Sequence, residues 1–241
     1  MTVIAQDFVS VQPFETDIIT LGVGQRTDVL VTANAPPGSS FWMRSTISSG
    51  DGCSGSANPA VTAAIFYDGC DTTKAPTSTP NPSYTYDNIQ NCRNDDISTN
   101  FVPSAPLAAQ TPSVSTNVSV NLVVNSTGHF NWELNNVTFH ADYNVPIAAQ
   151  ASHGNLSFPA EWQVYNYGSN GTIQINLYNN LNATHPWHIH GRDMLILSSG
   201  PGEWDGTVTN PSNPVRRDTH IIQNFGHLVM QFPNDNPGVW P

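Results

Sequence analysis

Charged side chains are scarce in this chain, and lysine is almost absent. Only 10% of the 241 residues are charged, and Lys74 is the only lysine; an average soluble protein has roughly a quarter charged residues. Acidic residues outnumber basic ones by 18 to 7. The basic residues are scattered apart from Arg216 and Arg217. Because binding to nucleic acid or to an anionic membrane needs a basic patch, neither is an expected partner.

Long apolar runs and paired cysteines are also missing. No stretch approaches the roughly 18 to 20 apolar residues of a membrane span, and no basic-then-apolar leader opens the sequence. Cys53, Cys70 and Cys92 form no Cys-x-x-Cys pair, which argues against zinc-finger and thioredoxin-type sites. In a secreted chain two of the three should form a disulfide; three buried thiols are the alternative.

The residues that are abundant, Gly, Pro, Ser, Thr and Asn, favour strands joined by many turns. No segment shows a helical stripe with caps, and turn signals recur at a spacing typical of β-sandwiches. Turns are expected at Pro13 and around Gly22 and Gly24, and from 71 to 113 the pattern gives way to a surface linker. The expected strands cover residues 2–5, 28–32, 41–47, 60–67, 118–124, 130–134, 172–178, 193–197, 219–222 and 227–232.

Three of the eight histidines lie within six residues, in Asn182-Ala-Thr-His-Pro-Trp-His-Ile-His-Gly-Arg-Asp193. In a strand, His188 and His190 project from one face. Pro186 lacks a backbone donor and disfavours a helical residue before it, so His185 is expected in a turn before the strand, aimed elsewhere. Neutral imidazoles in such clusters bind Cu, Zn, Fe or Ni. A lone His-x-His pair often arises by chance, but this denser cluster predicts two metal positions.

The segment His185-Pro-Trp-His-Ile-His-Gly191 resembles the His-Pro-x-His-x-His-Gly motif of the multicopper oxidases, in particular the fungal (ascomycete-type) laccases. Further segments are similar to that family and follow its order: Met1-Thr-Val-Ile-Ala-Gln-Asp-Phe8, Leu21-Gly-Val-Gly-Gln-Arg-Thr-Asp-Val29, Pro214-Val-Arg-Arg-Asp-Thr219 and Asp235-Asn-Pro-Gly-Val-Trp240. The resemblance implies cupredoxin-like Greek-key β-sandwiches. Residues 1–70 would end the second domain, 71–113 would link domains, and 114–241 would form a third domain truncated before the last copper motif.

The same resemblance implies that the chain is an internal fragment. In the family, a His-Cys-His motif with the blue-copper thiolate follows the Asn-Pro-Gly-x-Trp segment, and a first domain with two His-x-His motifs precedes the position of Met1. Neither lies within residues 1–241. Met1 is therefore expected to be an internal methionine, and this polypeptide alone is expected to be neither blue nor active on phenols.

Residue by residue, the resemblance assigns His185 to the type 1 (blue) copper, His188 to the type 2 copper and His190 to one type 3 copper. The parent enzyme would use four coppers to couple one-electron oxidation of a small phenolic or similar substrate to reduction of dioxygen to water. Arg192 departs from the family, because many laccases carry a further histidine there. This changes the surroundings of the cluster without removing a ligand.

The resemblance also favours a disulfide between Cys53 and Cys92, which leaves Cys70 free or bonded outside the chain. The second half is crowded with Asn-x-Ser/Thr acceptor sites, which favours a secreted, extracellular glycoprotein. These six sequons are at Asn117, Asn125, Asn136, Asn155, Asn170 and Asn182.

Two other classes of protein remain open. A cupin also places His-x-His on a strand and binds one metal, but it normally has a glutamate three or four residues later, where Asp193 is the only nearby carboxylate. A cupredoxin-like structural glycoprotein without metals is the third class. His220 and His227 flank apolar runs and are weak ligand candidates, and the sequence from Arg216 to Asp218 is expected to form a salt-bridged structural corner.

Overall fold

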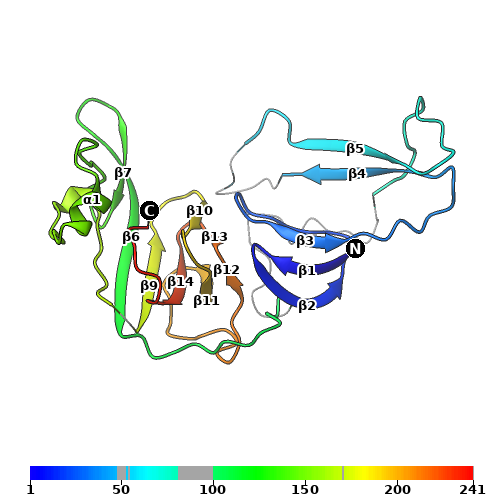
Figure 1. Ribbon diagram of the computed structural model, residues 1–241. Helices are drawn as coiled ribbons and strands as arrows, with labels where there is room; N and C mark the ends of the chain where they lie inside the picture. Colours follow the sequence, from blue (N-terminus) through cyan, green and yellow to red (C-terminus); the bar gives the residue numbers. More distant parts are fainter. Residues whose placement is uncertain (48–52, 54, 81–99, 170, 241) are drawn as a thin grey trace.

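The computed structural model describes residues 1–47, 53, 55–80, 100–169 and 171–240. The strands of these residues form four sheets (Figure 1). In the described ranges no helix is both long and apolar enough to cross a bilayer.

Residues 1–30 fold into a three-stranded antiparallel sheet of order β2-β1-β3. Its strands are β1 (Thr2–Gln6), β2 (Val9–Glu15) and β3 (Thr27–Leu30). The prediction of a turn at Pro13 is wrong, because Pro13 lies within β2. That strand is at the edge of its sheet, where a missing backbone donor is tolerated. The chain turns instead at Asp7, which lies between β1 and β2 and has a φ of 49°. A second sheet follows, in which β4 (Ser40–Thr46) pairs with β5 (Ala60–Phe66) in antiparallel orientation.

The second half of the chain forms a seven-stranded sheet of order β12-β11-β14-β9-β6-β7-β8. Within it β6 and β9 are parallel, and the other neighbours are antiparallel. Its strands are β6 (Val114–Val124), β7 (Phe130–Leu134), β8 (Val137–Thr138), β9 (Thr172–Asn179), β11 (Met194–Pro201), β12 (Arg216–Arg217) and β14 (Gly226–Pro233).

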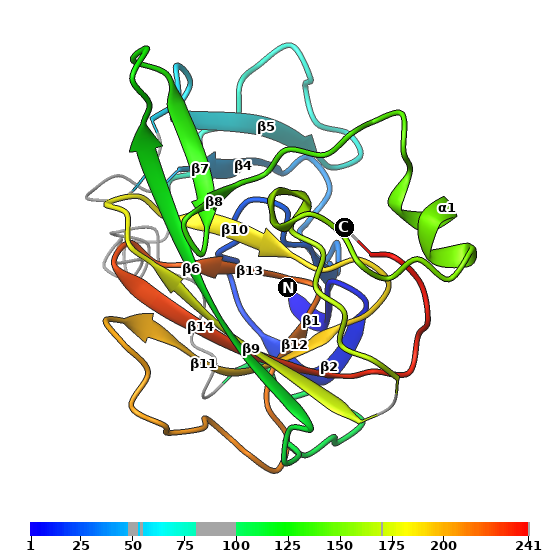
Figure 2. The same cartoon turned by 90° about the vertical axis from the view of Figure 1, so that its left-hand side faces the viewer.

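A separate two-stranded sheet carries the histidine motif. It consists of β10 (His185–His188) and β13 (Thr219–Ile222), which run antiparallel side by side (Figure 2). Two short helical turns, α1 (Ile147–Ser152) and η3 (Ala160–Trp162), lie between β8 and β9. Neither was expected, because a helix of six residues or fewer is too short to show an apolar stripe.

The main hydrophobic core joins three of the four sheets and includes no residue of β4 or β5. Leu177, Ile196 and Leu228 of the large sheet are fully buried and belong to one cluster with Ile222 of β13 and Val3 of β1. Figure 1 shows β10 and β13 between the large sheet and the β1–β3 sheet. The histidine motif therefore lies where these two parts of the molecule meet.

The described end of the predicted linker, from residue 100 onward, is held against both parts. Phe101 packs edge-on against Phe14 with ring centroids 5.3 Å apart, and Gln12 donates its backbone N–H to the carbonyl of Val102. Further along, the side chain of Gln231 bonds both the N–H and the carbonyl of Gln110. Burial and hydrogen bonds thus fix a segment without regular secondary structure.

Two of the three cysteines lie among the described residues, so the structure tests only part of the disulfide prediction. Cys53 is disulfide-bonded and Cys70 is a free thiol. Cys92 lies outside the described residues, so its predicted pairing with Cys53 stays a prediction. Asn170, one of the six predicted glycosylation sites, also lies outside them.

Candidate metal centre

His185 is the first residue of strand β10, so the expectation that it lies in a preceding turn is wrong. In β10, His185 pairs with Ile222 and Pro186 with Ile221 of β13. Among the described strands β13 is the only partner of β10. A strand with one open edge tolerates the missing N–H of a proline, and this is why the strand can begin before Pro186.

His188 and His190 come together, but not on a shared strand. Strand β10 ends at His188, and His190 lies in the bend that follows. Their ring centroids are nevertheless 4.9 Å apart, with the ring planes at 63°. Gly191 makes the turn with a φ of 78°, a conformation that favours glycine, and a Cβ there would lie 3.0 Å from the ring of Trp240.

His185 lies apart from that pair, in aromatic surroundings. Its ring meets that of Trp132 in β7 edge to face, with centroids 4.8 Å apart and planes at 83°. Its Nε2 is buried without a hydrogen-bond partner among the described residues. Burial lowers the pKa of His185, so the ring is neutral at pH 7 and has a nitrogen lone pair for a metal.

His188 is held by one ring nitrogen. Its Nδ1 lies 2.9 Å from the carbonyl oxygen of Asp218 and 3.0 Å from Oγ1 of Thr219. A carbonyl oxygen can only accept, so Nδ1 carries a proton, and in the neutral ring the lone pair is then on Nε2. The side chain of His188 is 44% exposed. It lines an open pocket of about 420 Å³ formed by Phe8, residues 188–193 and Asp218.

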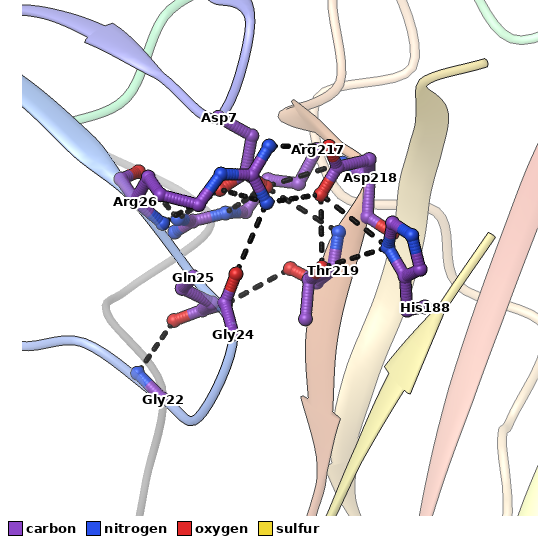
Figure 3. Close-up of polar contacts among 9 residues, drawn as sticks. All are labelled: Asp7, Gly22, Gly24, Gln25, Arg26, His188, Arg217, Asp218 and Thr219. Carbon is purple, nitrogen blue, oxygen red and sulfur yellow. Dashed lines mark hydrogen bonds and ion pairs between the residues drawn. The ribbon is translucent and has the colours of Figure 1, made fainter. Parts of the chain in front are cut away.

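Asp218 belongs to an ion network that crosses from the β1–β3 sheet to β12 and β13 (Figure 3). Arg26 donates a hydrogen bond to each oxygen of the Asp218 carboxylate, and its Nη1 lies 2.7 Å from Oδ1. Burial alone would raise the pKa of Asp218, but hydrogen bonds from Arg26 and Thr219 outweigh it, so the pKa lies below its ordinary value. Asp218 is therefore an anion beside His188 at neutral pH.

A second ion pair lies deeper in the same network. Arg217 donates to Asp7 over 3.1 Å, and the two side chains are 3% and 0% exposed. The same Asp7 carboxylate accepts the backbone N–H groups of Asp218 and Thr219 and that of Arg26. The structural corner expected around Arg217 and Asp218 is thus confirmed, with partners from the far end of the chain.

Gly22 and Gln25 complete this interface, and their residue types do not mark them as part of a site. A Cβ on Gly22 would lie 2.2 Å from the side chain of Ile221, so only glycine allows the close approach. Gln25 accepts the N–H of Gly22 and donates to the carbonyl of Thr219. The only signal for either residue was its place in the segment from Leu21 to Val29.

Neither His220 nor His227 lines the pocket beside His188. His220 is fully buried, and neither ring nitrogen has a partner among the described residues. Burial, with a smaller effect of the Arg217 charge, lowers its pKa to about 3. His227 bonds the carbonyl of Gly202 and the hydroxyl of Ser198. In the described ranges no three His, Cys, Asp or Glu side chains are grouped so as to hold a metal by themselves.

Comparison with known proteins fits this arrangement. Two family models, both described as multicopper oxidase, match residues 1–70 and 129–241. Laccase-3 of Botryotinia fuckeliana is 32% identical over 99% of this chain and 55% of its own length. Laccase-2 of Podospora anserina is 31% identical over the whole chain and 41% of its own length. The chain therefore spans about half or less of these curated relatives.

Solved structures give the same result for the fold. A laccase from Botrytis aclada superposes with a TM-score of 0.82 at 27% identity, over 99% of this chain and 43% of that one. Fet3p, titled a multicopper oxidase that functions in iron import, superposes with a TM-score of 0.80 at 23% identity, over 99% of this chain and 47% of that one. These matches confirm the predicted all-β, cupredoxin-like fold class.

Proposed function

Because the chain belongs to the multicopper oxidase family, we propose that it supplies copper ligands to a laccase-like oxidase. The observation that carries the proposal is His188, whose Nδ1–H is bonded to the carbonyl of Asp218 while its ring lies 4.9 Å from that of His190. Metal-bound imidazoles are usually oriented by a hydrogen bond from the other ring nitrogen. The comparisons give no support to the cupin or to the metal-free glycoprotein.

The proposed ligand assignment follows the division of the three histidines. His185, a neutral, half-buried ring that packs against Trp132, serves the type 1 copper. His188 serves the type 2 copper and His190 one type 3 copper, in the pocket they share. A complete enzyme of this family holds four coppers, so these three histidines are only part of its ligand set, which also includes the type 1 thiolate.

Copper held by these histidines would supply one-electron chemistry, coupling oxidation of a small phenolic or similar reductant to the four-electron, four-proton reduction of dioxygen to two waters. The chain's own residues orient and protect the ligands. Asp218 and Thr219 hold the His188 ring, and Trp132 packs against His185. The open pocket beside His188 and His190 leaves room for a molecule as small as dioxygen.

We also propose that the protein is a secreted glycoprotein. Of the predicted acceptor sites, Asn117, Asn136, Asn155 and Asn182 are exposed and Asn125 is half-buried, so most could carry a glycan on the folded surface. Glycosidase treatment of protein from culture medium tests this: the mass should fall, and an unchanged mass would contradict it.

Copper analysis of the full-length protein tests the proposed oxidase. About four coppers per chain, with oxygen consumed during phenol oxidation, is the expected result. One metal per chain would favour a cupin, and none would favour the metal-free glycoprotein. His188→Ala should lose copper from the cluster, whereas His153→Ala, at an exposed histidine outside the motif, should keep the full number.

A further inference from the structure

Two sequence segments that contain no predicted ligand meet beside His188. Arg26 lies in the segment from Leu21 to Val29, and Asp218 lies in the segment from Pro214 to Thr219. The residues are 192 positions apart in the chain and are joined by two hydrogen bonds (Figure 3). The proposed copper ligands do not explain why this contact is built.

Arg26 is itself fixed in place. Its guanidinium lies 5.0 Å from the ring centroid of Phe8 and donates to the carbonyl of Gly24 over 3.0 Å. A planar guanidinium that bonds both oxygens of a carboxylate also fixes the orientation of that carboxylate. Asp218 is therefore oriented from the β1–β3 sheet, across the interface.

The hydrogen bonds from Asp218 to His188 run in one direction. Thr219 donates its hydroxyl proton to Oδ1 of Asp218 over 2.8 Å, because an ionised carboxylate can only accept. The hydroxyl oxygen of Thr219 is then free to accept, and it lies 3.0 Å from Nδ1 of His188. Oδ1 of Asp218 itself is 3.6 Å from that nitrogen. The chain of donors thus requires the proton of the imidazole to be on Nδ1.

We propose that Arg26 is a positioning residue that sets the tautomer and ring orientation of His188 through Asp218 and Thr219. The consequence for copper rests on the proposed function, since only a lone pair on Nε2 can face the cluster. The effect of Arg26 on the imidazole itself does not depend on a metal.

This role differs from that of the neighbouring arginine. Arg217 is 3% exposed and neutralises the buried Asp7, so it holds the two parts of the molecule together. Arg26 is 40% exposed and Asp218 is 8% exposed, and a glutamine at position 26 can still donate an amide hydrogen bond to the Asp218 carboxylate. Arg26→Gln is therefore expected to fold and to change His188 locally.

Imidazole ¹H–¹⁵N correlation spectra of the full chain, prepared free of metal at about pH 8, test the proposal. This pH lies above the ordinary histidine pKa of about 6.5, so the tautomer can be read directly. In the wild type, His188 should show one tautomer with the proton on Nδ1. Arg26→Gln should convert it to a mixture of both tautomers, with the Nδ1-protonated share at least halved.

Two further variants and two references accompany this measurement. Arg26→Lys keeps the charge without the fork and should give an intermediate mixture. Thr219→Val removes the hydroxyl from the hydrogen-bond chain and should lower the Nδ1-protonated share of His188 as Arg26→Gln does. The proposal therefore stays testable if Arg26→Gln fails to fold. Arg44→Gln, at an arginine in β4, should leave His188 unchanged. His227, bonded at Nδ1 to the carbonyl of Gly202, should keep its signals throughout.

A single Nδ1-protonated tautomer of His188 in both Arg26→Gln and Thr219→Val would overturn the proposal. Equal changes at His227 and His188 would also overturn it, since they would indicate general loosening. Copper content is measured on separate samples of the full-length protein. A tautomer change in a protein that binds no copper would contradict the proposed function and leave the role of Arg26 intact.

Discussion

The two ends of strand β10 present their histidines to opposite surroundings. His185 faces an aromatic ring and buries Nε2 without a partner among the described residues. His188, three residues later, is hydrogen-bonded to Asp218 and Thr219, and its side chain is 44% exposed. Since side chains alternate along a strand, residues three apart point to opposite faces. One short strand can therefore serve two sites of different polarity.

The partner strand shows the same division. Ile222, opposite His185, is fully buried in the core, and Thr219, opposite His188, takes part in the ion network. The apolar side is held by burial, and the polar side is held by charges from residues 1–26. Variants that affect one side and leave the other unchanged test this division.

The largest loss of stability is expected when the buried ion pair between Arg217 and Asp7, on the polar side, is broken. Arg217→Met leaves the carboxylate of Asp7 buried and without its closest cation, which typically costs about 3–5 kcal/mol of unfolding free energy. Urea unfolding measures the loss. Arg44→Met should change stability by less than about 0.5 kcal/mol, as most surface substitutions do. Equal stabilities of the two variants would show that the network does not join the two parts of the molecule.

A pH effect comes next, from His220 in β13. Its pKa in the folded protein is about 3, against about 6.5 in an unfolded chain. Between these values the unfolded chain binds a proton that the folded protein excludes, so this contribution to stability is present above about pH 6.5 and is lost as pH falls. From pH 7 to 5 the loss is about 2 kcal/mol.

Replacement of this histidine isolates its share of the pH dependence. His220→Leu should lose about 2 kcal/mol less than the wild type between pH 7 and 5 in urea unfolding, because it has no proton to exclude. His153→Leu, at an exposed histidine, serves as the matched control and should follow the wild type. Parallel pH profiles for His220→Leu and the wild type would show that the ring is not held neutral by burial.

The smallest effect is expected on the aromatic side. Trp132→Leu removes the edge-to-face contact with His185, and such contacts contribute about 0.5–1.5 kcal/mol beyond the area they bury. The imidazole signals of His185 should shift while those of His188 stay in place. Trp162→Leu removes a tryptophan that stacks on Phe158 and should shift neither. A shift of the His188 signals in Trp132→Leu would mean that the two ends of β10 are not independent.

Local pattern predicted much of the fold, and long-range contacts account for what it missed. Alternation predicted the strand around Ile173 and Ile175. Alternation also placed His188 and His190 together, although β10 ends at His188, whereas His185 was expected apart because of Pro186. Pro13 and Pro186 were taken as strand breakers, although both lie in strands with an open edge. An edge position depends on which strands pair, and local composition does not carry that information.

The polar network could not be predicted for the same reason. Arg217 and Asp218 were expected in salt bridges, but their partners Asp7 and Arg26 are about 190 to 210 positions away. Charge and spacing cannot select such partners among the other acidic and basic residues. The histidines were predictable because three of one chemical type lie within six residues.

The central claim is that β10 presents His185 and His188 to different copper sites, and spectroscopy of the copper-loaded full-length protein tests it most directly. His185→Ala should abolish the blue thiolate absorption and keep the type 2 copper EPR signal, whereas His188→Ala should abolish the type 2 signal and keep the blue band. Loss of the same signal in both variants, or of neither, would contradict the account.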